Sequence, residues 1–100
     1  MTGGLRVLLY HRTDDVAAIE QGYHVVSRRL AEVPGMVGNE LLGSVHRPGE
    51  YVVVSSWRSL ADFTEWEHGP DHRRQTSPLR PFRDTTMSRP FGVYHVMGTY

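Results

Sequence analysis

Apolar positions divide the first third of the chain into a strand and a helix. Residues 5–12, LRVLLYHR, form an apolar run typical of a buried strand. Apolar residues then recur at spacings of three and four, which predicts an amphipathic helix. These residues are Val16, Ile19, Tyr23, Val26 and Leu30. The Thr-Asp-Asp sequence at 13–15 favours the helix start, and Val-Pro-Gly at 33–35 favours its end.

A β-hairpin follows the helix. Residues 36–46 alternate between polar and apolar, and Val37, Leu41 and Val45 are expected on one strand face. Residues 47–50, Arg-Pro-Gly-Glu, have the composition of a turn. Residues 51–57, YVVVSSW, have the strongest strand composition in the chain because they are rich in β-branched and aromatic side chains.

The stretch from Trp57 to His72 predicts a strand end, a short helix and an abrupt stop. Ser59 is expected to cap the helix, with Asp62 as its capping-box partner. The apolar residues of this helix share one face. They are Leu60, Phe63 and Trp66. Gly-Pro at 69–70 cannot continue a helix, so the helix is expected to end near residue 68.

The C-terminal third contains one irregular segment and one strand. Residues 70–90 carry four of the six prolines and five arginines, and we expect them to be irregular, with room for one helical turn at 71–76. Residues 91–97, FGVYHVM, predict a closing strand.

The order of these elements is β-α-β-β-α-β, which predicts an α+β, ferredoxin-like fold. Two helices would cover one face of a four-stranded antiparallel sheet. We expect a single domain over residues 1–100, with an ordered core at about 5–97. The other face of such a sheet is uncovered, and a second copy of the chain is the usual cover, so we expect a homodimer.

Composition excludes several function classes. The formal net charge is zero, which gives no support to nucleic-acid binding, and no apolar run is long enough to span a membrane. The N-terminal residues lack the pattern of a signal peptide, so a cytoplasmic location is expected. The chain has no cysteine and all its basic residues are arginine. Thiolate nucleophiles, thiolate metal sites and Schiff-base chemistry are therefore excluded.

Residues 57–66, WRSLADFTEW, resemble the motif W-x-S-x-x-x-F-x-x-W of the antibiotic biosynthesis monooxygenase (ABM) superfamily. The sequence PGMVGNELL at 34–42, the strand at 51–57 and the histidine six residues after the second tryptophan also match its pattern. The resemblance implies a dimeric α+β barrel with a pocket between the helices and the sheet of each protomer. It also implies oxygenation of polyketide anthrones or phenols with O₂ alone, heme degradation, or related cyclase chemistry.

The heme-degrading branch of that superfamily does not fit this chain. Its enzymes carry a histidine ten residues after the pocket tryptophan and an asparagine in the first strand. The chain has Thr76 at the first position, and residues 5–12 contain no asparagine. We therefore expect no heme and no other cofactor.

Trp66, Phe63 and His72 are the first candidates for the site. The family resemblance makes Trp66 a pocket wall that stacks with Phe63 on a flat substrate, whereas its helical spacing alone is equally compatible with core packing. His72 follows the helix stop and can turn back over the pocket. Histidine exchanges protons near neutral pH, so His72 is a candidate base, although a purely structural hydrogen bond is the alternative.

The remaining candidates depend on which way their side chains face. His24 is a second candidate base at the edge of the apolar helix stripe, beside Tyr23. Tyr10 and Tyr51 are candidate substrate contacts on strands, where an error of one residue reverses the face. Histidines 11 and 95, Tyr94 and Asn39 carry the same ambiguity. Arg73 is a candidate partner for a substrate anion, as are its neighbours at 74, 80 and 83, with a solvated surface as the alternative.

No metal site is expected. His68 and His72 are four residues apart, but the Gly-Pro break between them prevents ligation from one continuous helix. The leading hypothesis is a cofactor-independent monooxygenase that acts on an aromatic, polyketide-like small molecule with O₂. The alternatives are a cyclase or isomerase that uses the same pocket without O₂, and a non-catalytic dimer that binds a metabolite.

Overall fold

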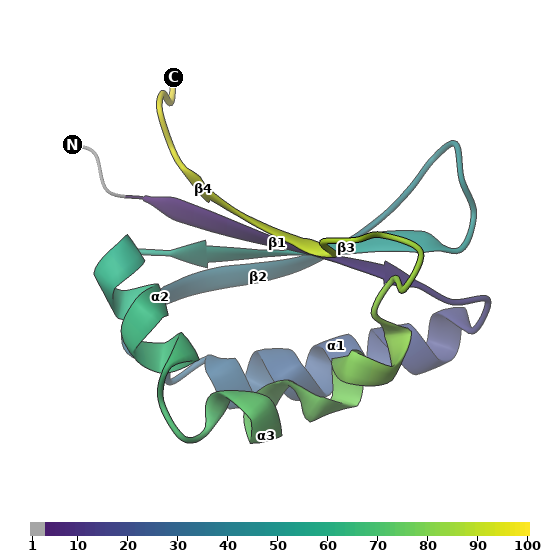
Figure 1. Cartoon of the computed structure of the whole chain (residues 1–100), viewed down its shortest axis with the longest axis horizontal. Helices are drawn as coiled ribbons and strands as arrows, with labels where there is room; N and C mark the ends of the chain where they lie inside the picture. The colour runs from purple at the N-terminus through teal and green to yellow at the C-terminus, as the bar shows by residue number, and fades with distance from the viewer. Residues whose placement is uncertain (1–3) are drawn as a thin grey trace.

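The computed structural model describes residues 4–100 and shows a sheet with helices on one side (Figure 1). Its elements are β1 (Leu5–Arg12), α1 (Val16–Leu30), β2 (Met36–Gly43), β3 (Glu50–Trp57), α2 (Leu60–Glu67), α3 (His72–Thr76), the 3₁₀ helix η1 (Ser77–Phe82) and β4 (Phe91–His95). The predicted ferredoxin-like α+β fold is confirmed, and α3 and η1 are added to the two predicted helices.

The four strands pair antiparallel in the order β2-β3-β1-β4. β1 and β3 are therefore central, which agrees with their apolar composition. Directly paired residues share a sheet face. The pairings Leu5 with Trp57 and Val7 with Ser55 join side chains that are all buried, so they lie on the face that the helices cover.

The core lies between this face and the helices. Its buried apolar side chains come from β1, α1, β3, α2 and η1. They are Leu5, Val7, Ile19, Val26, Leu30, Val53, Trp57, Phe63 and Leu79. Burial of apolar surface is the main favourable term in folding, so these contacts hold the helices against the sheet.

Ser59 caps α2 as predicted, but the capping box is not closed. The Ser59 hydroxyl accepts a hydrogen bond from the Asp62 amide at 3.1 Å. The Asp62 carboxylate pairs with the Arg58 guanidinium at 2.8 Å instead of returning to the cap. Gly35, at φ +88°, lies against Asp62, and a side chain there would collide with the carboxylate. Asp62 thus joins the turn before β2 to the start of α2.

The predicted alternation in β2 was wrong at both ends. A β-bulge between Met36 and Gly38 interrupts the pairing with β3, and Val37 is exposed. The strand ends at Gly43, so Val45 lies outside it and is exposed. Only Leu41 of the three predicted residues lies in the regular pairing, opposite Val53. A bulge shifts the period of two by one residue, and composition does not reveal it.

The segment 70–90, predicted to be irregular, is helical over half its length. α3 occupies the expected helical turn, and η1 continues from it. Prolines are compatible with the start of a helix, and Pro78 stands there in η1. Leu79 fixes η1 in the core. η1 also approaches α1 closely, because a Cβ on Gly22 would lie 2.9 Å from the Pro78 carbonyl oxygen.

Within residues 4–100, no helix is long and apolar enough to cross a membrane. The expected cytoplasmic location stays a prediction.

Candidate active site

A cavity of about 260 Å³ lies between the helices and the covered face of the sheet. Apolar side chains from β1, α1, β3, α2 and η1 make up most of its wall. Its polar lining residues are His11, Asn39, Ser55, Glu67, His72, Thr76, Arg80 and Arg83. An apolar cavity with a few converging polar groups is the usual form of a small-molecule site. Its volume is close to the lower end of the usual range, about 300 Å³.

Four rings form a continuous aromatic wall in this cavity. The Trp66 ring lies 5.2 Å from Trp57, 6.1 Å from Phe63 and 5.2 Å from the His72 ring, measured between centroids. The His72 ring meets Trp66 edge-on, at an interplanar angle of 79°. Such a wall presents large apolar surface to a flat ligand and holds it by ring contacts.

Trp66 is held in place by α3. Its indole Nε1 donates a hydrogen bond to the Gln75 side-chain oxygen at 2.7 Å, across the Gly-Pro break. This bond fixes the ring plane and ties α2 to α3. The same bond leaves the Trp66 indole without a free donor, so this ring offers a ligand its π face and edge.

A polar group lies at the β2–β3 side of the cavity. The Asn39 amide donates to the Ser27 hydroxyl at 3.0 Å and accepts from the Ser55 hydroxyl at 2.9 Å. The Tyr23 hydroxyl donates to the Asn39 carbonyl oxygen at 2.6 Å. Buried polar groups need such partners, and these bonds fix the orientation of the Asn39 side chain.

Two arginines give the opposite side of the cavity a positive charge. Arg80 and Arg83 both line it. Burial lowers the pKa of Arg80, and the charges of Arg73 and Arg83 lower it further. Among the described residues, buried Arg80 Nε and Trp57 Nε1 have no hydrogen-bond partner. Unpaired buried donors are costly to folding.

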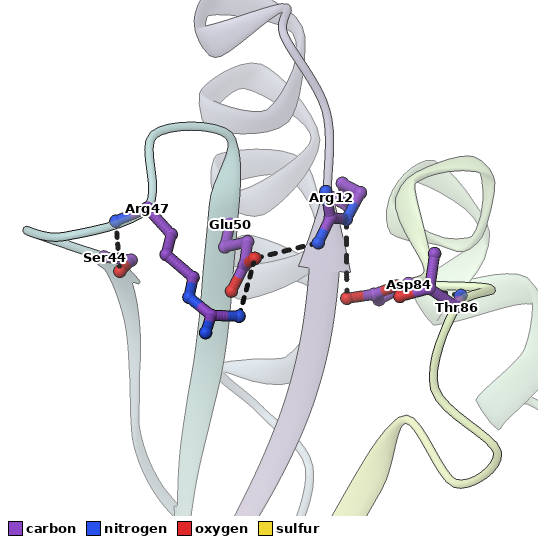
Figure 2. Close-up of polar contacts among 6 residues, drawn as sticks. All are labelled: Arg12, Ser44, Arg47, Glu50, Asp84 and Thr86. Atoms are coloured by element: carbon purple, nitrogen blue, oxygen red, sulfur yellow. Dashed lines mark hydrogen bonds and ion pairs between the residues drawn. The ribbon is translucent and has the colours of Figure 1, made fainter.

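The segment that carries Arg83 is anchored to the end of β1 (Figure 2). Arg12 pairs with Glu50 of β3 at 2.8 Å and with Asp84 at 3.7 Å. Hydrogen bonds from the Thr86 hydroxyl and amide lower the pKa of Asp84, and Arg12 adds to this effect. Asp84 also donates its backbone N–H to the Tyr10 carbonyl oxygen at 3.0 Å. The rim of the cavity is therefore fixed to the sheet.

Two histidines line the cavity, and both favour the neutral form. Burial lowers the pKa of His72 below its ordinary value of 6.5, and Arg80 lowers it further, while Glu67 opposes the shift. Burial also lowers the pKa of His11, although a hydrogen bond to the Leu9 carbonyl oxygen opposes this and Arg83 reinforces it. A neutral imidazole in an apolar cavity is able to accept a proton.

The structure brings three of the predicted site residues together in the cavity: His72, Trp66 and Phe63. Tyr10 also lines it. However, β1 alternation turns the Tyr10 side chain to the face opposite His11, so its backbone forms the rim.

The other four predicted residues do not line the cavity. His24 and Tyr23 belong to a shallower surface hollow between α1 and β2, because the edge of the helix stripe faces that strand. Tyr51 faces the helices but packs at the Gly43 end of the sheet. Arg73 is exposed on α3 and does not line the cavity. Arg80 and Arg83, two of the other candidate partners for a substrate anion, do line it.

His11 is the most important residue that sequence reasoning did not select. Its signal was present in the strand pattern, because Leu5, Val7 and His11 share one parity of β1. The apolar run at 5–12 has no strict alternation, so the face of His11 was left open. Asn39 was hidden in the same way by the β-bulge before it.

The chain was compared with known proteins. The family description "Antibiotic biosynthesis monooxygenase" matches residues 5–75, most of the chain and all of the elements from β1 to α2. The chain belongs to this family. Membership confirms the resemblance found in the sequence.

Solved structures of the ABM family share the fold. SnoaB of Streptomyces nogalater, a cofactor-independent oxygenase, is similar with a TM-score of 0.77 at 18% identity, over 99% of this chain and 97% of SnoaB. An antibiotic biosynthesis monooxygenase structure from Nitrosomonas europaea is similar with a TM-score of 0.71 at 14% identity, over 100% of this chain and 94% of that one. At these identities the likeness shows the fold alone.

Two larger Streptomyces proteins are similar in sequence. Protein SchA of Streptomyces halstedii is 29% identical over 87 residues, which are 87% of this chain and 23% of SchA. The 42.8 kDa protein in the whiE locus of Streptomyces coelicolor is 34% identical over 64 residues, which are 63% of this chain and 16% of that protein. The chain thus spans less than a quarter of the length of either relative.

The lowered pKa of His11 predicts that stability depends on pH. Below its ordinary pKa of 6.5, the unfolded chain binds more protons at this residue than the folded chain does. The free energy of unfolding therefore falls as the pH decreases from about 6.5 towards the folded pKa. His11→Asn removes this titration, so its Tm should fall less than that of the wild type between pH 7.5 and 5.

Thermal unfolding across that range measures the effect. His24→Asn, at an exposed position of α1, is the matched control and should follow the wild type. Asp84 does not interfere, because its ordinary value of 3.8 lies below the range. An equal loss of Tm in wild type and His11→Asn would contradict the prediction.

Proposed function

We propose that this protein is a cofactor-independent monooxygenase that acts on an aromatic, polyketide-like small molecule. The observation that carries the proposal is the combination, in one cavity, of an aromatic wall with two neutral histidines and two arginines. A flat ring system would stack against Trp66, Phe63 and Trp57. Its oxygen atoms would meet the polar groups.

The chemistry needs a base and an anion site. A neutral pocket histidine removes a proton from the phenol or the activated C–H of the substrate. The arginines stabilise the resulting anion, which is electron-rich enough to reduce O₂. For an anthrone the overall reaction is R₂CH₂ + O₂ → R₂C=O + H₂O, so one oxygen atom enters the product and the other leaves as water.

Membership of the ABM family supports an oxygenase over the alternatives. The cofactor-independent oxygenase SnoaB has the same fold. A cyclase or isomerase would use the same base and anion site without O₂. A non-catalytic metabolite-binding protein would use the aromatic wall alone.

Oxygen consumption tests the proposal. The purified, metal-free protein is incubated with anthrone and with 1,8-dihydroxyanthrone, and O₂ uptake and quinone formation are followed against a protein-free control. We expect uptake above the control, with one O₂ consumed per quinone. Trp66→Ala should lower kcat/KM about 10- to 100-fold, because it removes the ring contact with the substrate.

Leu60→Ala is the matched control, because Leu60 lies on α2 but outside the cavity and is exposed. It should retain wild-type kcat/KM. Absence of O₂ uptake across both anthrones would contradict the oxygenase proposal. Conversion that persists without O₂ would instead support the cyclase alternative.

We also propose that a second copy of the chain covers the outer sheet face. β1 and β3 place apolar side chains there, with Leu8 opposite Val54. Exposed Tyr94 extends the patch onto β4. Sedimentation velocity should give a dimer for the wild type and a monomer for Val54→Glu, since burying a carboxylate in an apolar interface is unfavourable.

Ala17→Glu places the same charge on the exposed helix side and should remain dimeric. A monomeric wild type at micromolar concentration would overturn this part of the proposal.

A further inference from the structure

His11 occupies an enclosed position at the base of the cavity. It is only 5% exposed, and its register partner on β3 is Tyr51. The other ionisable groups around the cavity are Arg83 on the segment bridged to it, and Arg80, His72 and Glu67. A buried histidine on an otherwise apolar strand face is costly unless its ring nitrogens are used.

The backbone fixes the tautomer of this ring. His11 Nδ1 lies 3.0 Å from the Leu9 carbonyl oxygen. A carbonyl oxygen only accepts, so Nδ1 must carry the proton of the neutral ring. Nε2 therefore holds a lone pair, and among the described residues it makes no hydrogen bond. The hydrogen bond to Leu9 of the same strand therefore leaves Nε2 as the basic atom of the neutral ring.

The surroundings favour an anion next to this base. The backbone of Arg83 forms a β-bridge with His11, so this arginine is brought directly to the histidine. Arg80 lines the same cavity with its buried Nε unpaired. After proton transfer, a phenolate or enolate oxygen placed between the imidazolium Nε2–H and these guanidinium groups would receive hydrogen bonds from both sides.

We propose that His11 is the general base that removes the proton from a phenol or enol bound in the cavity. The substrate O–H bond breaks, the proton passes to Nε2, and the electron pair stays on the oxygen, which Arg80 and Arg83 stabilise. The resulting imidazolium keeps its Nδ1–H bond to Leu9. This inference rests on the proposed function and names the residue and the substrate class, an ionisable phenol or enol.

His72 has a different part in this arrangement. No hydrogen bond fixes its ring tautomer among the described residues, and its edge-on contact with Trp66 is its main interaction. It also starts a helix of five residues at the mouth, where it is half-buried. His72 is therefore a positioning residue, which acts through the Trp66 ring.

A variant pair separates these roles. His11→Asn keeps an amide N–H near the position of Nδ1, so the bond to Leu9 is retained, but it has no atom at Nε2. With an active anthrone, kcat should fall about 100-fold or more while KM changes less than about threefold. The residual activity of His11→Asn should increase with pH, because a substrate that is already ionised in solution no longer needs the base. His72→Asn should instead raise KM and lower kcat less than about tenfold.

A second readout does not need turnover. The phenolate of 2-hydroxyanthraquinone absorbs at longer wavelength than the phenol, and quenching of Trp57 and Trp66 fluorescence reports its binding. Without O₂, the wild type and His72→Asn should bind the dye and lower its apparent pKa. His11→Asn should bind the dye but lower its apparent pKa less than the wild type does, because Arg80 and Arg83 remain while the proton acceptor is lost.

Each outcome of the dye experiment either supports or overturns the role of His11 as the base. Greater ionisation of the dye by wild type than by His11→Asn supports the proposal even if no anthrone is oxidised, so the base and the oxygenase can fail separately. Equal ionisation by wild type and His11→Asn would overturn it. So would dye that binds to the wild type without ionising, or no binding at all, because the proposal needs a phenol in the cavity.

Discussion

A four-stranded sheet with helices on one side must bury that face, and this burial constraint positions every group in the site. Side chains at alternate positions of β1 and β3 point into the layer beneath α1 and α2, and most are apolar. The helices close over them because removing apolar surface from water drives folding. Where η1 and α3 continue the layer, the closure leaves a cavity with aromatic walls.

The polar groups on this buried face fall into two classes. Asn39 and Ser55 satisfy each other and Ser27, so they cost little and fix the local geometry. Trp57 Nε1 and Arg80 Nε are buried without partners among the described residues. Buried donors left unpaired are a cost to folding.

The sequence allowed the element order, and hence the fold, to be predicted, because helical and strand periods differ clearly. The motif at 57–66 and the helix stop after it also indicated that His72 turns back towards Trp66, and the two rings are in contact. The strand register could not be predicted from the sequence. The bulge at Met36–Gly38 and the sheet face on which His11 lies depend on pairing across strands, which no local pattern encodes. The helical turn at 71–76 was foreseen and corresponds to α3, but η1 was missed because its prolines suggested irregularity, whereas Leu79 packing decides its structure.

The proposed proton transfer requires that the strand backbone set the neutral His11 ring with its proton on Nδ1 and a free lone pair on Nε2. ¹⁵N chemical shifts of the histidine side chains, assigned with His11→Asn, measure this state directly at pH 7. We expect a protonated Nδ1 and an unprotonated Nε2 for His11. A His11 ring with its proton on Nε2, or with both nitrogens protonated at pH 7, would contradict it.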